Sequence, residues 1–469
     1  MAQRPRLMEV LRSALCLLVL AAAAAAATAA DAAPARPLQT AIVDPVEFTS
    51  PTAGTALEHA VKAGASAIKV PVFWDTIAPV TRSAGFRPAD PLEPAYYWKG
   101  LDAELRLIRS HGLEPFVYIA GPPDWAKRRI DGFSRVDPGQ YRQFVLAAVR
   151  RYSGKVQGLP RVRYWEAWNE PNKVPGREFK PGAADWYREL VNAFARSAHT
   201  VKGNAVIAGG LAPFGISTAV APLAFMRSLL CLSPGRKPHA TCSAKVHFDI
   251  WSTDPYSAGG PTHQAYRKND VSIGDLPDMK AVLDDGVRLG HVVSTQPVRF
   301  WVTEFSWDSN PPDPKGVPAA LEGRWAAEAL YRMWSAGVSL VTWFTLRDQP
   351  VRTSPYQSGL YFRGSSLAAD RPKPALTGFR FPFVAYPRAK KVFVWARTPT
   401  GRAATIVVEQ RGSSGWRRLG AIRANRAGIA SATLAAHGRG PVRGRIGRDA
   451  SLAFSLVAPP DRLYQPFGS

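Results

Sequence analysis

Two short segments place a glutamate where a β-strand should end. Residues 164–172 read Tyr-Trp-Glu-Ala-Trp-Asn-Glu-Pro-Asn, so Glu170 follows a β-like run. Residues 300–305 read Phe-Trp-Val-Thr-Glu-Phe, so Glu304 closes another such run. If both strands belong to one parallel barrel, their carboxyl groups face the same barrel mouth. Cleavage of a glycosidic bond needs such a pair, because one carboxyl group protonates the leaving oxygen while the other attacks or activates water.

The elements that must position these glutamates alternate along the chain. Helical patterns such as Leu101–His111, Gly139–Tyr152, Ala183–Val201 and Ala319–Ala336 separate eight strand candidates. The strand candidates are Thr40–Glu47, Ala67–Phe73, Glu114–Ala120, Val162–Trp168, Ala205–Leu211, Phe248–Asp254, Val298–Glu304 and Val338–Leu346. Strands spaced by helices favour a parallel sheet, and eight such units predict an α/β fold, a (β/α)₈ TIM barrel, over residues 38–388.

The two glutamate motifs together resemble the clan A glycoside hydrolases. Trp-Asn-Glu-Pro followed by Asn, with a second Glu closing a later strand, resembles the acid/base and nucleophile motifs of these retaining (β/α)₈ enzymes. The resemblance covers about residues 38–388. It implies that Glu170 is the acid/base, that Glu304 is the nucleophile, and that Asn169 holds the 2-hydroxyl group of the substrate.

Three further segments extend the resemblance to sugar-binding positions. The run from Lys69 to Trp74 resembles the strand-two motif of family 5, which usually begins with Arg. Asp254-Pro255-Tyr256 resembles a strand-six His-x-Tyr motif whose Tyr contacts the nucleophile, and Trp343 resembles a Trp that forms the floor of the sugar site. The substrate-binding candidates from these segments are therefore Lys69, Trp74, Asp254, Tyr256 and Trp343. Core packing is the alternative for Trp74 and for Trp343, and a structural ion pair is the alternative for Lys69. Because Lys69 replaces the usual Arg and Asp254 replaces the usual His, family 39 or a less studied clan A family stays open beside family 5.

Composition and motif content exclude several other classes of protein. The chain has 469 residues, of which 46% are apolar and 10% are aromatic, a balance typical of globular proteins. It has no GxGxxG, GxxxxGK[ST], GxSxG or HExxH pattern. We therefore expect no cofactor and no metal ion, and a carbohydrate as substrate.

Glu166 has the same strand parity as Glu170, so we expect it to point inward as a buried carboxylate below the catalytic layer.

The N-terminus and the cysteines predict an extracellular protein. Residues 1–33 combine three arginines, an apolar run over residues 14–30 and then small residues, as in a secretory signal peptide. The alternative is an uncleaved membrane anchor; after cleavage no membrane span is expected. Cys231 and Cys242 would then be the mature chain's cysteines, and an oxidising compartment favours a disulfide between them. Two buried free thiols are the alternative.

After Arg388 the sequence pattern changes from alternating strands and helices to short strands alone. Val392–Ala396, Ala404–Gln410, Trp416–Arg423, Ile429–Leu434, Val442–Ile446 and Leu452–Val457 are short β-like runs without helical patterns between them. Residues 389–469 are therefore predicted to form a small antiparallel β-sandwich that supplies no catalytic group. From residue 390 onward there are 14 Lys and Arg against 3 Asp and Glu. This excess suggests association with anionic cell-envelope polymers.

Three functional hypotheses remain at this point. The first is a secreted, monomeric, retaining glycosidase that acts on a β-linked oligo- or polysaccharide. The second is a catalytically silent carbohydrate-binding barrel. The third is an envelope-associated polyanion-binding protein, suggested by the net charge of +24. Nucleic acid is not an expected partner, because the basic residues are spread over the whole chain and are not gathered with aromatic residues in one segment.

Overall fold

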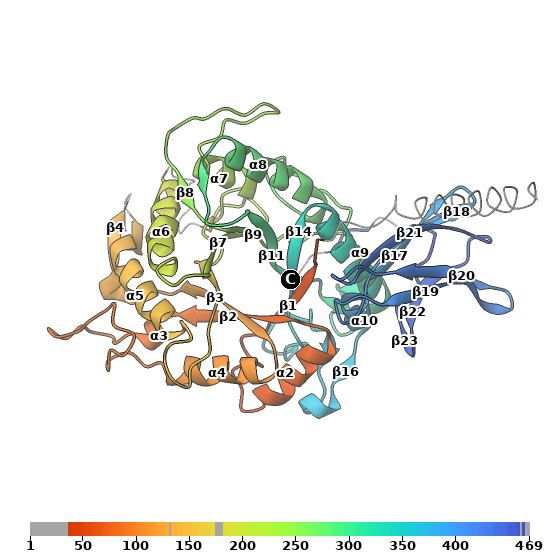
Figure 1. Ribbon diagram of the computed structural model, residues 1–469, viewed down its shortest axis with the longest axis horizontal. Helices are drawn as coiled ribbons and strands as arrows, with labels where there is room; N and C mark the ends of the chain where they lie inside the picture. The colour runs from red at the N-terminus through yellow and green to blue at the C-terminus, as the bar shows by residue number, and fades with distance from the viewer. Residues whose placement is uncertain (1–35, 131–132, 174–181, 460–461, 465–469) are drawn as a thin grey trace, which may run out of the picture.

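A closed eight-stranded parallel barrel forms the larger part of the molecule (Figure 1). The computed structural model describes residues 36–130, 133–173, 182–459 and 462–464. Around the barrel the strands follow the order β1-β14-β11-β9-β7-β6-β3-β2. The expected α/β fold class is therefore confirmed. The expected signal peptide lies outside the described residues.

Each barrel strand overlaps one of the expected runs. The strands are β1 (Gln39–Val43), β2 (Ala67–Phe73), β3 (Glu114–Ala120), β6 (Tyr164–Ala167), β7 (Ala205–Leu211), β9 (Ile250–Thr253), β11 (Arg299–Phe305) and β14 (Val338–Phe344). β2, β3 and β7 coincide with the expected ranges. The strands that differ do so by one to four residues at an end, where the chain leaves the hydrogen-bonded ladder.

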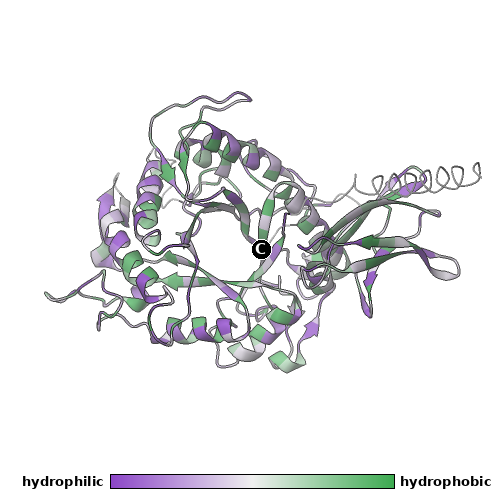
Figure 2. Cartoon of the chain, in the orientation of Figure 1, coloured by the Kyte–Doolittle hydropathy of each residue, from purple (hydrophilic) through white to green (hydrophobic). Residues whose placement is uncertain are grey.

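Amphipathic helices cover the outside of the barrel. They are α2 (Ala53–Lys62), α3 (Trp74–Ile77), α4 (Lys99–Ser110), α5 (Pro138–Arg151), α6 (Ala183–Ala198), α7 (Pro222–Leu229), α8 (Leu276–Arg288), α9 (Ala319–Ser335) and α10 (Pro374–Arg380). Hydrophobic and hydrophilic residues occur together on each surrounding helix (Figure 2). α5 shows why such a helix begins where it does: Asp137 accepts hydrogen bonds from the amides of Gly139 and Gln140, and Pro138 opens the first turn.

The barrel interior changes from apolar to polar along its axis. The lower layer is an apolar plug in which the Trp301 ring packs against Phe116 and Tyr164. Lys69 follows Ala67 of the plug by two residues in β2, and Glu166 follows Tyr164 by two residues in β6. Both charged side chains lie in the next layer, where they form an ion pair. Alternate residues of a strand face the same side, so residues two positions apart lie in successive layers of the interior. The lower layer is apolar, and the next layer contains charged side chains.

Two β-bulges adjust which residues face the mouth. In β11 the register shifts between Val302 and Phe305, so one extra residue is inserted opposite β14. Strict alternation from Trp301 would turn Glu304 outward, and the bulge returns its side chain to the interior. A second shift in β7 occurs at Gly209, which has φ 111° and where a Cβ atom would lie 2.1 Å from a carbonyl oxygen of β9. Glycine is required there.

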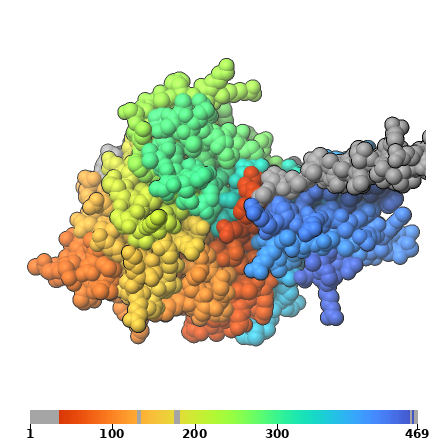
Figure 3. Space-filling model, viewed as in Figure 1, coloured from red at the N-terminus to blue at the C-terminus, as the bar shows by residue number. Residues whose placement is uncertain are grey.

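The C-terminal region forms two antiparallel sheets, as expected. One has the strand order β17 (Phe383–Arg388), β18 (Lys391–Arg397), β21 (Ile429–Ala435). The other has the order β20 (Gly415–Arg423), β19 (Thr405–Gly412), β22 (Val442–Ile446), β23 (Asp449–Ala450). The sheets face each other where the Phe383 ring lies against Gly444. β17 contacts α9, and the C-terminal region, blue in Figure 3, lies against one side of the barrel.

Two details of this region differ from the sequence expectation. β17 precedes residue 389 and pairs with β18, so it belongs with the C-terminal sheets. The expected strand Leu452–Val457 does not form. Phe454 makes only an isolated bridge to Val442. Between this bridge and β23, the Gly444 amide of β22 donates to the hydroxyl of Ser451, and a side chain thus takes the place of a backbone carbonyl.

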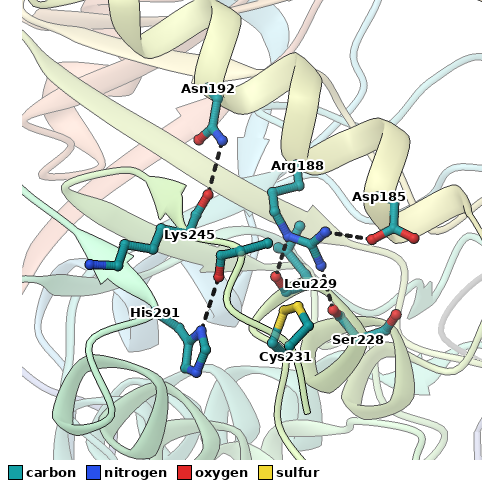
Figure 4. The surroundings of a disulfide bond; sticks show 10 residues. Asp185, Arg188, Asn192, Ser228, Leu229, Cys231, Lys245 and His291 are labelled. Carbon is teal, nitrogen blue, oxygen red and sulfur yellow. Dashed lines mark hydrogen bonds and ion pairs between the residues drawn. A yellow bond between two sulfur atoms is a disulfide. The ribbon is translucent and has the colours of Figure 1, made fainter. Parts of the chain in front are cut away.

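The expected disulfide joins Cys231 and Cys242, whose Cα atoms lie 5.3 Å apart. Cys231 follows α7, and α6 holds the chain on both sides of the bridged loop (Figure 4). Arg188 donates a hydrogen bond to the carbonyl oxygen of Leu229 at 2.9 Å, and Asn192 donates to that of Lys245 at 2.9 Å. Helices of such a barrel run back from the mouth, so the disulfide lies at the opposite end of the barrel from the strand C-termini.

Helices within the described ranges are too short or too polar to cross a membrane.

Candidate active site

Glu170 and Glu304 lie at the C-terminal ends of β6 and β11, at the same mouth of the barrel. The turn after β6 is unusual, because Trp168 and Glu170 adopt φ angles of 77° and 47°. The Glu170 amide donates a hydrogen bond of 2.9 Å to the carbonyl oxygen of Gly210 in β7, which fixes this turn. Non-glycine residues with positive φ are uncommon and concentrate at functional sites.

The Glu304 carboxylate is held by two donors, one in β2 and one in the segment after β9. Lys69 Nζ donates to Glu304 Oε1 at 2.8 Å, and the Tyr256 hydroxyl donates to Glu304 Oε2 at 3.1 Å. The side chain of Glu304 keeps 15% of its surface exposed. The geometry therefore fixes both oxygens while leaving the group accessible from the mouth. The Tyr256 contact is the one that the resemblance implied.

Glu170 has a different electrostatic environment. Burial raises its pKa, and the negative charge of Glu304 raises it further. Lys173, which donates to Glu170 Oε2, acts in the opposite direction. Because the charge of Glu304 raises the pKa of Glu170, the two carboxyl groups interact electrostatically across the mouth.

Lys69 is buried and contacts three polar groups of the site. Besides Glu304, its Nζ lies 3.1 Å from Asn169 Oδ1 and 3.7 Å from Glu166 Oε2. Burial alone would lower the pKa of Lys69, but the surrounding carboxylates hold it well above its usual range. The sequence left substrate contact or an ion pair open. The structure shows the ion pair, since the Lys69 side chain has no exposed surface.

Glu166 is the buried carboxylate that the strand parity predicted. Its side chain is fully buried, and Ser252 donates a hydrogen bond to Oε1 at 2.9 Å. Burial raises its pKa, and the nearby Lys69 charge opposes that rise. Glu166 thus lies one layer below the mouth, where it balances the charge of Lys69.

Asp254 does not line the mouth, contrary to the substrate-binding role expected for it. It is 0% exposed, and its Oδ1 accepts a 2.8 Å hydrogen bond from Thr303, the residue next to Glu304 in the bulge. Burial raises its pKa well above the usual range. Asp254 therefore holds the Thr303 side chain within the bulge of β11.

Trp74 and Trp343 were candidates for sugar contact with core packing as the alternative, and the structure shows core packing for both. Both are 0% exposed and face the layer between the strands and the helices. The Trp74 ring stacks on Phe144 of α5 at 4.9 Å, and the Trp343 ring packs against Phe379 of α10 at 5.9 Å. Each tryptophan sits one residue away from the inward-facing parity of its strand.

The neighbouring phenylalanines have the inward-facing parity. Phe73 ends β2 and is 46% exposed, and Phe344 ends β14, where its ring lies 6.5 Å from Tyr256. Tyr118 of β3 lies below them, with Lys69 Nζ 4.9 Å from the centre of its ring. Sequence reasoning missed all three. Counting in steps of two from the apolar plug would have found them.

No group of three or more His, Cys, Asp or Glu side chains in the described ranges has the arrangement of a metal site. The mouth presents two carboxyl groups, Glu170 and Glu304, and carboxyl groups can transfer protons or act as nucleophiles.

No protein-family model and no curated protein matches the sequence. Among solved structures, the chain is similar to a glucosidase from Croceicoccus marinus, with 14% identity, a TM-score of 0.48 and coverage of 85% of this chain and 93% of that chain. It is also similar to a family 1 β-glucosidase from Thermotoga maritima, with 14% identity, a TM-score of 0.46 and coverage of 74% and 97%. A family 5 xyloglucanase from Paenibacillus pabuli gives 12% identity, a TM-score of 0.43 and coverage of 69% and 92%. Such similarities do not assign an activity to this chain.

Proposed function

We propose that this protein is a secreted retaining glycoside hydrolase that acts on a β-linked oligo- or polysaccharide. The observation that carries the proposal is that two carboxyl groups at one mouth have different hydrogen-bond partners and different electrostatic surroundings. Glu304 accepts hydrogen bonds from Lys69 and Tyr256, which suits an ionised nucleophile. Glu170 has a raised pKa, which suits a group that must hold a proton at the start of the reaction.

The proposed reaction has two displacement steps. In the first, a Glu304 oxygen attacks the anomeric carbon, the bond to the leaving oxygen breaks, and Glu170 gives its proton to that oxygen. Esterification of Glu304 removes its negative charge, so Glu170 can then ionise. In the second step, Glu170 takes a proton from water, the resulting hydroxide attacks the anomeric carbon, and the Glu304 carboxylate leaves. Retention requires carboxyl groups about 5–5.5 Å apart.

Two variants test the roles of the carboxyl groups. Glu304→Ala should abolish turnover of every substrate, while Glu170→Ala should slow poor leaving groups far more than activated aryl glycosides, which need little protonation. Glu58→Ala, on the exposed face of α2, is the control and should keep full activity. The measurement is kcat/KM on aryl glycosides and polysaccharides at pH 5–7, followed by NMR of the anomer formed first. An inverted product, or full activity of either site variant, would contradict the mechanism.

The alternative of a silent carbohydrate-binding barrel makes a different prediction. Such a protein would bind oligosaccharides in calorimetry with no turnover, and Glu304→Ala would bind as tightly as the unmodified chain. Asn169, which we propose contacts the substrate 2-hydroxyl, would then affect affinity alone.

The pH dependence provides a further test of Glu170. Since its pKa is raised, its proton is lost at higher pH than in an ordinary glutamate. The rate should therefore fall as the pH rises through this pKa, most strongly for substrates whose leaving group needs the proton. Activated aryl glycosides should show a weaker alkaline decline in kcat. An identical decline for both substrate classes would mean that a group other than Glu170 causes the loss of rate at alkaline pH.

The extracellular location and the monomeric state are part of the same proposal. The disulfide between Cys231 and Cys242 supports an oxidising compartment. N-terminal sequencing of the secreted protein should show cleavage near residue 33, and light scattering should give the mass of one chain. An intact N-terminus in a membrane fraction would instead identify an anchor.

A further inference from the structure

One face of the four-stranded C-terminal sheet carries a regular array of arginines. The buried residues of β19, such as Ile406 and Val408, point toward the other sheet. The residues between them point to solvent, together with their cross-strand partners on β20 and β22. Five arginines occupy these outward positions, here called the basic face: Arg411, Arg418, Arg423, Arg443 and Arg445.

The basic face has a strong excess of positive charge. Glu409 is the one carboxylate among its register positions, and it pairs with Arg443 at 2.9 Å and Arg445 at 3.2 Å. Arg418 and Arg423 are exposed and have no carboxylate within ion-pair distance in the described ranges. Five cations against one anion on a folded sheet leave a surface that attracts anions.

The single aromatic ring among the register positions of the basic face, Trp416, contacts arginines of the same face. The Arg443 guanidinium lies 4.0 Å from the centre of the Trp416 ring, and that of Arg411 lies 5.8 Å from it. Trp416 thus orients arginines. Binding of single-stranded nucleic acid uses open aromatic faces on which successive bases stack, and a ring occupied in this way offers little for that purpose.

The arginines of the basic face are distributed over the three neighbouring strands β19, β20 and β22, so they can meet several carboxylates of one extended chain. Neighbouring strands lie about 4.8 Å apart, and alternate residues of a strand repeat after about 6.7 Å. The planar guanidinium group binds a carboxylate through two parallel hydrogen bonds. We propose that the basic face is a docking surface for a linear carboxylated polysaccharide, which holds the protein on an acidic polymer whatever reaction the barrel performs.

The test uses the full chain and polygalacturonate as the probe. Arg418→Glu/Arg423→Glu should weaken binding about tenfold or more and should make the dependence of log Kd on log salt shallower, because fewer counterions are released. Arg236→Glu/Lys237→Glu, on the exposed disulfide loop, changes the net charge equally and should weaken binding less than about twofold. Fully methyl-esterified polygalacturonate, which lacks the carboxylates, should not bind.

Several outcomes would overturn the docking surface. Equal loss in both double variants would show that total charge, and not this face, controls binding. Tighter binding of single-stranded DNA or of anionic vesicles than of polygalacturonate would identify another partner. Circular dichroism and the unfolding midpoint must match those of the unmodified protein. If the charge reversal fails to fold, Arg418→Gln/Arg423→Gln should still weaken binding severalfold, and unchanged affinity there would refute the proposal.

Discussion

At the scale of single residues, Lys69 determines the charge balance of the mouth. It is the cation that contacts Glu304, Asn169 and Glu166. Lys69→Met leaves buried carboxylates without their partner, so we expect a loss of about 3–5 kcal/mol in the free energy of unfolding and a fall in kcat/KM of at least about 100-fold. Urea unfolding and steady-state kinetics measure the two effects.

A double variant separates the structural role of Lys69 from its role at Glu304. Lys69→Met/Glu166→Gln removes one positive and one negative charge from the buried pair. We expect this variant to regain much of the stability but not the activity, because Glu304 still lacks its donor. Recovery of both would mean that Lys69 serves only to neutralise Glu166.

The neighbours Phe344 and Trp343 offer a second residue-scale comparison. Phe344 has inward-facing parity at the mouth, whereas Trp343 is fully buried and donates a 2.7 Å hydrogen bond to the carbonyl oxygen of Ser358. Phe344→Ala should mainly raise KM. Trp343→Ala should cost about 3–5 kcal/mol in stability, as for other large core residues. Kinetics and unfolding curves on both variants check this division, and the reverse pattern would restore the sequence-based assignment of Trp343.

At the scale of elements, α9 contains a buried titratable group. Glu322 is 0% exposed, and neither of its carboxyl oxygens has a hydrogen-bond partner in the described ranges. Burial raises its pKa to about 8, while Lys373 partly opposes the rise. The folded state therefore keeps a proton that the unfolded chain loses near pH 4.5. By linkage, its contribution to stability falls as the pH rises from about 4.5 to 8, by at most about 1.4 kcal/mol per pH unit.

Glu322→Gln removes this titration while keeping the shape of the side chain. The variant and the unmodified chain should have similar unfolding free energies at pH 5, and the variant should be the more stable by pH 8. Urea denaturation at three pH values measures the difference. Glu58→Gln, on the exposed side of α2, is the control and should leave the pH dependence unchanged. Parallel curves for Glu322→Gln and the unmodified chain would contradict the raised pKa.

The elements also show how far the sequence could predict this site. Apolar runs bounded by glycine and polar residues located β2, β3 and β7, because buried parallel strands are continuous apolar segments. The direction of a side chain at a strand end depends on parity, and Trp74 and Trp343 each lie one residue from the inward position. Glu304 faces inward only through a bulge, which is a cross-strand register shift that a single sequence does not reveal.

At the scale of the whole molecule, the barrel and the C-terminal sheets share one apolar interface. The rings of Trp334 in α9 and Trp395 in β18 lie 5.5 Å apart. Arg397, which is 3% exposed, donates a 2.7 Å hydrogen bond from Nε to the carbonyl oxygen of Leu38, just before β1. Residues from both parts occupy one continuous hydrophobic cluster, so separating them would expose apolar surface on each.

This shared interface predicts that the two parts unfold together. Trp395→Ala should cost about 3–5 kcal/mol, and the loss should appear equally in the barrel and in the sheets, because each relies on the same contact. Hydrogen exchange of β6 and β19 peptides across a urea series should give one midpoint, shifted to lower urea in the variant. Trp416→Ala, on the basic face, should change that midpoint little, since its ring packs on arginine side chains at the surface. If β19 lost protection while β6 and glycosidase activity stayed intact, the C-terminal sheets would be an independent domain, and removing them would leave a working barrel.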